Sequence, residues 1–221
     1  MTSPVAVIVG AGPGLGLSVA RRWCREGYQA VLLGESLEWM EPLAETLIAE
    51  GFQAEGAAFD LLDPESVRAV ISGVGERLGR IDLVHFNPSA WRAKDVLELT
   101  VPELLEDVAF GVGALLPAVQ AAVPYFSDGA RVLVTGSAAA DTPSTMAPSL
   151  GVQKAAIRNL VTSLDATLAD RGVRAVAVQI NGVLAKEGPF SPEPIADFMW
   201  HAVHPTGEWQ AQVGYHGEPA R

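Results

Sequence analysis

The chain has 221 residues, a formal net charge of −11 and a composition that is 49% hydrophobic. Its length suits one large domain and is short for two ordinary domains joined by a linker. The negative charge repels phosphate backbones, so we expect no nucleic-acid partner. The sequence holds a single cysteine, Cys24, which excludes an internal disulfide and fits a reducing compartment. The apolar run at residues 5–9 is too short for a signal peptide or a membrane span, so we expect a cytoplasmic protein without membrane contact.

Apolar runs and amphipathic stretches alternate along the chain. Short apolar runs, several rich in β-branched residues, predict strands at 5–9, 30–33, 57–59, 81–86, 131–135, 174–180 and 210–215. Apolar residues that recur every three or four positions predict helices at 15–27, 37–50, 63–78, 149–171 and 195–203, and a further helix that ends near Tyr125. Such alternation predicts a doubly wound α/β fold, a parallel sheet with helices on both faces that gives a Rossmann-like three-layer αβα sandwich. We expect a single domain over residues 1–221, with a short lid over the substrate at about 186–221.

A glycine-rich turn, Gly10-Ala-Gly-Pro-Gly-Leu-Gly16, lies between the first predicted strand and the first predicted helix. Positions without side chains let the backbone approach a pyrophosphate at the positive end of a helix. We therefore expect this turn to bind a dinucleotide through Gly10, Gly12, Pro13, Gly14, Leu15 and Gly16. A tight connection without a ligand is the alternative interpretation.

The spacing Gly10-x-x-x-Gly14-x-Gly16 resembles that of the short-chain dehydrogenase/reductase family, and the resemblance extends over about residues 5–185. Asp60 matches the family acid that contacts the adenine, and Asn87-Pro88-Ser89 occupies the place of the family's Asn-Ala-Gly. The run from Asn181 to Leu184 replaces the turn whose backbone meets the nicotinamide amide. The resemblance thus implies a cofactor site that also includes Asp60, Leu61, Asn87, Pro88, Ser89 and Leu184.

Glu35 follows the second predicted strand, where it can accept hydrogen bonds from a ribose hydroxyl. Its charge would repel the additional phosphate of NADP. The expected cofactor is therefore NAD or NADP, with NAD favoured. An acid that faces solvent at the start of a helix is the alternative interpretation of Glu35.

The resemblance also implies a catalytic serine, a tyrosine thirteen residues later and a lysine four residues beyond. In the family the tyrosine transfers the proton, the lysine lowers its pKa and holds the nicotinamide ribose, and the serine orients the substrate oxygen. Ser137 and Lys154 match two of these positions, and Leu150 stands at the position of the tyrosine. No tyrosine lies between residues 137 and 154, so a shift of register cannot restore the acid.

The residues around this gap leave several roles open. Asp141 is a candidate substitute acid, and the asparagine that holds a water relay in the family aligns near Phe110 or Gly111, neither of which can replace it. Trp91 and Trp209 are expected to line an open substrate site or to mark a subunit contact. The four histidines show no metal-ligand spacing, so we assign no metal.

These features support three hypotheses. The first is a divergent NAD(P)-dependent short-chain oxidoreductase that acts on an unidentified carbonyl or alcohol substrate. The alternative is a non-catalytic protein that binds a nucleotide or a partner, and the third is a lyase, isomerase or cyclase on the same scaffold. The resemblance also implies a homodimer or homotetramer that assembles through the helices after the fourth and fifth strands.

Overall fold

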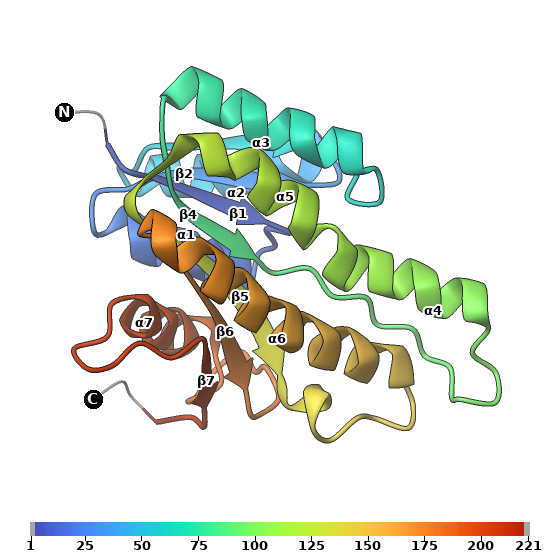
Figure 1. Ribbon diagram of the computed structural model, residues 1–221. Helices are drawn as coiled ribbons and strands as arrows, with labels where there is room; N and C mark the ends of the chain where they lie inside the picture. Colours follow the sequence, from blue (N-terminus) through green and yellow to red (C-terminus); the bar gives the residue numbers. More distant parts are fainter. Residues whose placement is uncertain (1–2, 219–221) are drawn as a thin grey trace.

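The structure is a computed structural model that describes residues 3–218, so residues 1–2 and 219–221 of the expected domain lie outside it. Seven parallel strands form one sheet in the order β3-β2-β1-β4-β5-β6-β7. The strands are β1 (Val5–Val9), β2 (Gln29–Gly34), β3 (Ala54–Ala58), β4 (Ile81–Phe86), β5 (Phe126–Ser137), β6 (Arg174–Ile180) and β7 (Gln212–Tyr215). The α-helices are α1 (Leu15–Cys24), α2 (Leu37–Ala49), α3 (Pro64–Leu78), α4 (Val101–Val108), α5 (Leu115–Ala122), α6 (Pro148–Leu168) and α7 (Pro192–Val203). Helices cover both faces of the sheet, which confirms the predicted doubly wound fold (Figure 1).

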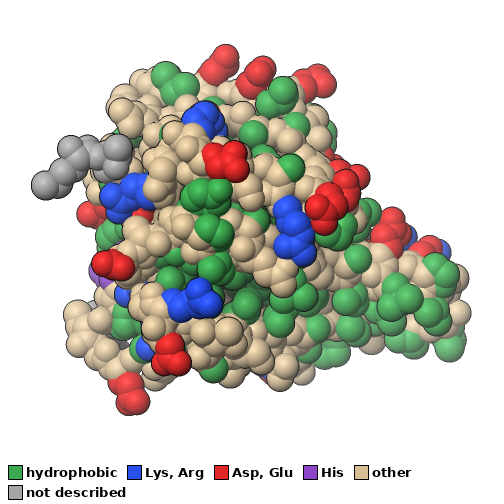
Figure 2. Space-filling model, turned by 45° about the horizontal axis from the view of Figure 1, so that its top comes forward, with side chains coloured by type: hydrophobic (Ala, Val, Ile, Leu, Met, Phe, Trp, Pro, Cys, Tyr) green, Lys and Arg blue, Asp and Glu red, His purple; other side chains and the backbone are tan. Residues whose placement is uncertain are grey.

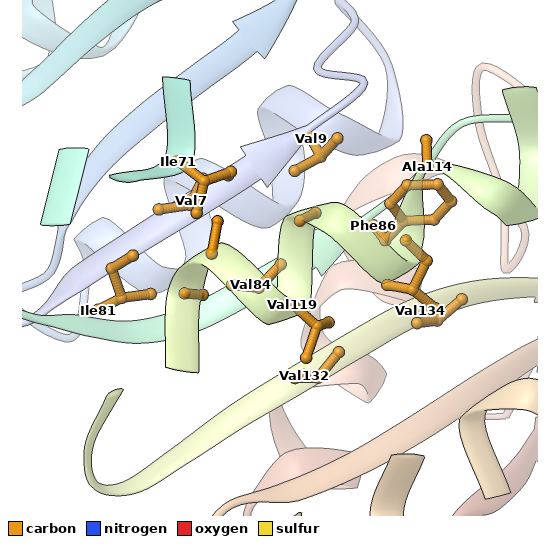
Figure 3. Close-up of a cluster of buried hydrophobic side chains, with 14 of the residues drawn as sticks. Val7, Val9, Ile71, Ile81, Val84, Phe86, Ala114, Val119, Val132 and Val134 are labelled. Atoms are coloured by element: carbon orange, nitrogen blue, oxygen red, sulfur yellow. The ribbon is translucent and has the colours of Figure 1, made fainter. Parts of the chain in front are cut away.

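Two apolar layers enclose the sheet. On one face, α3, α5 and α6 pack on the sheet, and Figure 3 shows Ile71 of α3 and Val119 of α5 among buried side chains of β1, β4 and β5. On the other face, α1, α2 and α7 bury a second layer that includes Trp23. Because β1 lies in the middle of the sheet, all five of its residues are buried. A run of five apolar residues without polar alternation is typical of a strand covered on both faces.

Local sequence signals determine where α3 begins and ends. The Asp63 carboxylate accepts a hydrogen bond from the Glu65 N–H at 3.0 Å, and Pro64 occupies the first helical position. The helix ends at Gly79, whose φ of 77° lies in the left-handed region that glycine tolerates best. These residues confirm the helix start that the sequence predicts.

The largest errors in the predicted strand bounds lie at the starts of β3 and β5. β3 begins at Ala54 rather than residue 57, because its backbone pairs with β2 from Ala30 onward although its own sequence is small and weakly apolar. β5 begins at Phe126, five residues before the predicted start, and it pairs with β4 across an irregularity in register. In both strands the backbone pairing extends beyond the apolar run that sequence patterns detect.

The helical stretch at residues 101–125 is long and apolar enough to cross a membrane by length and composition. Half of its most apolar window is nevertheless buried inside the molecule, and α5 packs against α3. A core helix of an α/β protein passes the same test, so length and composition are weak indicators here. A π-helical turn at residues 109–113, called η1, separates α4 from α5.

Candidate active site

The glycine-rich turn leaves an open helix N-terminus at the carboxyl end of β1. Gly10 has a φ of +73°, and a Cβ built at Gly16 would lie 2.9 Å from the Ala11 Cα, so both positions favour glycine. A Cβ at Gly12 or Gly14 would meet nothing within 4 Å. No side chain caps α1, and its first turn contains no acid. The backbone at the positive end of α1 is therefore accessible to an anion, which fits a pyrophosphate group.

A cleft adjoins this turn at the carboxyl ends of the central strands. A cavity of about 380 Å³ is lined by Gly10, Ala11, Gly34, Glu35, Trp39, Met40, Phe59, Leu61, Asn87, Pro88, Ser89 and Phe110. A neighbouring cavity of about 450 Å³ shares Glu35, Leu61 and Phe110 and adds Asp60. The structure thus brings Glu35, Asp60 and Leu61 to the same cleft as Asn87, Pro88 and Ser89, all of which are expected to bind the cofactor.

Buried polar groups connect the central strands to the glycine-rich turn. The Asn87 Nδ2 donates to the Gly10 carbonyl at 3.1 Å, and the Thr135 hydroxyl donates to Asn87 Oδ1 at 2.8 Å. His85 Nε2 lies 2.9 Å from the same hydroxyl and must donate to it, because that hydroxyl proton is already engaged. Burial and, to a smaller extent, the nearby Lys154 charge lower the pKa of His85 to about 3, so the imidazole is neutral. Asn87 therefore supports the turn instead of projecting freely into solvent.

Lys154 lies on α6 and reaches the same end of the sheet. Its side chain is only 4% exposed, which excludes an ordinary surface lysine. Its Nζ donates to the Thr135 carbonyl at 2.9 Å and to the Pro88 carbonyl at 3.4 Å, leaving a third proton without a protein acceptor in the part of the chain described. Burial lowers the pKa of Lys154 to about 8. Lys154 is thus a buried amine that can gain or lose a proton near neutral pH.

The groups around Lys154 supply few other acids. Ser137 ends β5, and its hydroxyl accepts a hydrogen bond from the Ala139 N–H at 3.2 Å. Leu150 is half-buried one helical turn before Lys154, on the same side of α6. Hydrogen bonds from Arg158 and Gln179 lower the pKa of Asp141, whose carboxylate is ionised at neutral pH and is therefore a poor proton donor.

Gln153 is a buried residue of this region that the sequence reasoning missed. It lies beside Lys154 on α6 and is 0% exposed. Its amide is hydrogen-bonded to the backbone of Ala90, 63 residues earlier in the chain. A Cβ at Gly111 would lie 2.1 Å from the Gln153 Oε1, so an asparagine at that position would clash with this amide. Nothing in the local sequence distinguishes Gln153 from a polar residue on the surface of a helix.

Of the remaining predicted residues, Leu184 and Trp91 line cavities near the glycine-rich turn or the cleft, and Trp209 does not line the cleft. Leu184 shares a cavity of about 510 Å³ with Pro13, Gly14 and Leu15, and Trp91 lines a cavity of about 440 Å³ that also includes Glu35 and Ser89. The expectation that Trp209 lines the site is wrong. The guanidinium carbons of Arg131 and Arg174 lie over its ring, 5.3 and 4.9 Å from the ring centroid. These arginines lie near the amino ends of β5 and β6, away from the cleft, and cation–π contact holds the indole there.

Comparison with known proteins identifies the family. A family model described as short chain dehydrogenase matches residues 4–187. The chain belongs to the short chain dehydrogenase family. This short chain dehydrogenase is 29% identical over 217 residues to the oxidoreductase UcpA of Escherichia coli, a match that covers 92% of this chain and 81% of that protein.

Solved structures of low sequence identity share the same fold. A short chain dehydrogenase from Burkholderia cenocepacia in complex with NADP is 23% identical, with a TM-score of 0.86 and coverage of 98% of this chain and 97% of that one. An NADPH-bound short chain oxidoreductase from Pseudomonas aeruginosa, described as containing an atypical catalytic center, is also 23% identical. Its TM-score is 0.75, and the match covers 80% of this chain and 70% of that one.

Proposed function

We propose that this short chain dehydrogenase is a nicotinamide-dinucleotide-dependent oxidoreductase that acts on a carbonyl or alcohol group with Ser137 and Lys154 but without a catalytic tyrosine. The observation that carries the proposal is the buried Lys154 ammonium, which two backbone carbonyls hold beside the cleft. A buried charge without a carboxylate partner destabilises a fold, so a purely structural role would suit an uncharged residue better.

Residues of the cleft fit a dinucleotide. The backbone of residues 10–16 would hold the pyrophosphate, and Asp60, Leu61, Asn87, Pro88 and Ser89 would hold the adenosine half. Lys154 would bind the nicotinamide ribose, with Leu184 beside the turn. When bound, the nicotinamide would supply or accept a hydride at the reacting carbon. Related proteins in complex with NADP or NADPH support this class of cofactor.

We propose that NAD is preferred to NADP. Glu35 is exposed in the cleft, where its carboxylate can accept hydrogen bonds from a ribose hydroxyl and repel a 2′-phosphate. Arg92 is the one cation among the residues that line the three described cavities around Glu35. Its guanidinium already bonds the Asp107 carboxylate at 2.8–3.2 Å and Glu106 at 2.9 Å. No free cation of these cavities is thus available to neutralise the additional phosphate.

We further propose that Lys154 replaces the missing acid as the group that holds the exchangeable proton. Leu150, at the position of the family's tyrosine, has no proton to donate. Among the described groups nearby, His85 is neutral and Asp141 is ionised at pH 7, whereas Lys154 has a pKa of about 8. General acids work best when their pKa lies close to the operating pH. Ser137 would orient the substrate oxygen.

Fluorescence titration with NADH and NADPH, followed by turnover assays on a panel of aldehydes, ketones and alcohols, tests these proposals. We expect NADH to bind at least about tenfold more tightly than NADPH, the effect of about 1.4 kcal/mol of charge repulsion. Failure of both nucleotides to bind at millimolar concentration would reject the oxidoreductase proposal. Equal affinity for the two nucleotides would reject the NAD preference alone.

Leu150→Tyr tests whether the active site lacks only its acid. Because a positioned general acid typically contributes about 10²–10⁴ in rate, we expect turnover to rise within that range. Leu150→Phe is the matched control, since it adds the ring without the hydroxyl and should give no increase. A Leu150→Tyr protein that binds NADH but turns over no faster than Leu150→Phe would contradict this interpretation.

Leu150 also favours a second candidate function, a nucleotide-binding protein without turnover. An aliphatic side chain beside Lys154 removes the family's usual proton transfer and leaves the cleft of Gly10, Glu35 and Asn87 intact. Nucleotide binding by the wild type, with no reaction on any substrate of the panel, would favour this candidate. The role of the protein would then be to bind a nucleotide or a partner, without catalysis.

We also propose a homodimer or homotetramer. Hydrophobic side chains gather on the projecting end of the molecule that α4 and the preceding segment form (Figure 2). Leu97 is 92% exposed there, and Val96, Val101 and Leu105 are exposed beside it. Light scattering should show an oligomer that Leu97→Asp with Leu105→Asp weakens. A wild-type monomer at micromolar concentration would contradict the proposal.

A further inference from the structure

The segment at residues 87–92 forms one wall of the cleft, and each of its residues lines one of the cavities there. Ser89 and Trp91 are exposed, whereas Pro88 is buried and Ala90 and Arg92 are half-buried. Three alternate residues of this wall, Pro88, Ala90 and Arg92, are each hydrogen-bonded to a side chain of α6 or α4. Lys154 bonds the Pro88 carbonyl at 3.4 Å, and Arg92 bonds a carboxylate of α4.

Gln153 supplies the middle anchor at Ala90. Its Oε1 accepts a hydrogen bond from the Ala90 N–H at 2.9 Å, and its Nε2 donates to the Ala90 carbonyl at 3.1 Å. The same nitrogen donates to the Ser149 carbonyl at 3.2 Å, which ties the amide to its own helix. Both backbone polar groups of Ala90 are thus satisfied by one fully buried side chain. A paired contact of this kind fixes both the position and the orientation of the peptide.

The space for this amide depends on Gly111 in the π-helical turn η1. A Cβ at Gly111 would lie 2.1 Å from the Gln153 Oε1 and 2.9 Å from its Cδ. Real Cβ atoms do not approach other atoms so closely, and the end of Gln153 cannot move without breaking its bonds to Ala90. Gly111 and Gln153 therefore form a matched pair that joins α6, η1 and the cleft wall.

We infer that Gln153 is a positioning residue for the dinucleotide cleft: its amide clasps the Ala90 backbone and holds the wall at residues 87–90 where it meets the bound cofactor, and Gly111 provides the space for it. This inference rests on the proposed function, because it assigns the clasp to dinucleotide binding. Gln153 acts through Ala90, and its neighbour Lys154 fixes Pro88 on the same wall. Loss of the amide should let the wall move while the central sheet stays folded.

Gln153→Met tests the clasp because methionine nearly matches glutamine in length and cannot form the two hydrogen bonds. We expect hydrogen exchange at the Ala90 amide to accelerate at least about tenfold and NADH to bind about tenfold more weakly. Gln120→Met is the matched control, since Gln120 is exposed on α5 and bonds only Arg68 among the described residues. That control should leave both measurements unchanged.

Gln153→Glu gives a readout that a packing role would not produce. A buried carboxyl has a raised pKa, and its protonated form can accept from the Ala90 N–H and donate to its carbonyl as the amide does. NADH affinity of Gln153→Glu, measured relative to wild type at each pH, should therefore recover as the pH falls from 8 to 5.5. Gln153→Met should show no such recovery.

Gly111→Ala disturbs the same Gln153 amide from η1, because the added Cβ would clash with it. This variant provides the test if Gln153→Met fails to fold. It should weaken NADH binding in the wild-type background and have little effect in Gln153→Ala, where the added methyl group has room.

Wild-type protein that does not bind NADH rejects the proposed function, and the inference falls with it. Wild type that binds while Gln153→Met binds equally well overturns the inference alone. Unchanged exchange at the Ala90 amide in Gln153→Met, or additive effects of the Gly111 and Gln153 changes, also overturns it.

Discussion

Replacing Lys154 by methionine should change how the stability of the protein depends on pH at the alkaline end. Burial lowers the pKa of Lys154 from its ordinary value of 10.5 to about 8. Below pH 8 both the folded and the unfolded chain hold the proton, and the folded chain carries a desolvated ammonium. Between pH 8 and 10.5 the unfolded chain keeps the proton and the folded chain loses it, so the free energy of unfolding contributed by this group rises with pH.

The magnitude follows from the width of that interval. About 2.5 pH units at 1.36 kcal/mol per unit correspond to roughly 3 kcal/mol of stability gained by the wild type between pH 8 and 10.5. Methionine fills a similar volume and does not titrate. The difference in free energy of unfolding, wild type minus Lys154→Met, should therefore increase by about that amount across the interval.

Urea denaturation at pH 7, 8, 9 and 10 measures this difference. The raised pKa values of Tyr28, Tyr215 and Cys24 also affect alkaline stability, but these groups are present in both proteins and cancel in the difference. A difference that stays constant from pH 7 to 10 would show that the Lys154 amine is not desolvated in the folded chain. If Lys154 binds the nicotinamide ribose as proposed, NADH titration of Lys154→Met at pH 7 should give weaker binding.

The remaining predictions concern the polar groups and glycines of the cleft. His85 has a folded pKa of about 3 against an ordinary 6.5, so the unfolded chain binds the additional proton and stability falls by up to roughly 1.4 kcal/mol per unit as the pH drops below 6.5. His85→Leu should flatten this acid limb in denaturation experiments, and an equally steep limb would contradict the assignment. Gly16→Ala forces a Cβ to within 2.9 Å of the Ala11 Cα and should lower stability by about 1–3 kcal/mol. Gly12→Ala meets open space and should leave thermal stability within experimental error while weakening NADH binding; a large loss of stability would show that Gly12 is a packing position.

The fold and the glycine-rich turn were predictable because they depend on signals that are local in sequence. The run at residues 5–9 predicts a strand buried on both faces, and the glycine spacing predicts the turn that follows it. β3 was harder, because Ala54 to Ala58 contains small residues and takes its extended form from pairing with β2. Trp209 was misplaced because its position depends on Arg131 and Arg174, which lie far from it in the sequence.

The residues of the candidate active site differ in the same way: some are recognisable from local sequence spacing, and others depend on distant contacts. Lys154 is recognisable from its distance to Ser137, but its burial and its two carbonyl partners come from β4 and β5 and leave no pattern around residue 154. Gln153 gives even less warning, since its partner Ala90 is 63 residues away and the space it occupies depends on Gly111. Sequence spacing therefore identifies positions that lie a fixed number of residues apart on one helix, such as Leu150 and Lys154. A contact with a distant backbone segment becomes visible only when the tertiary structure is known, and this is why the leucine at the tyrosine position could be read from the sequence whereas the hydrogen bonds between Gln153 and Ala90 could not.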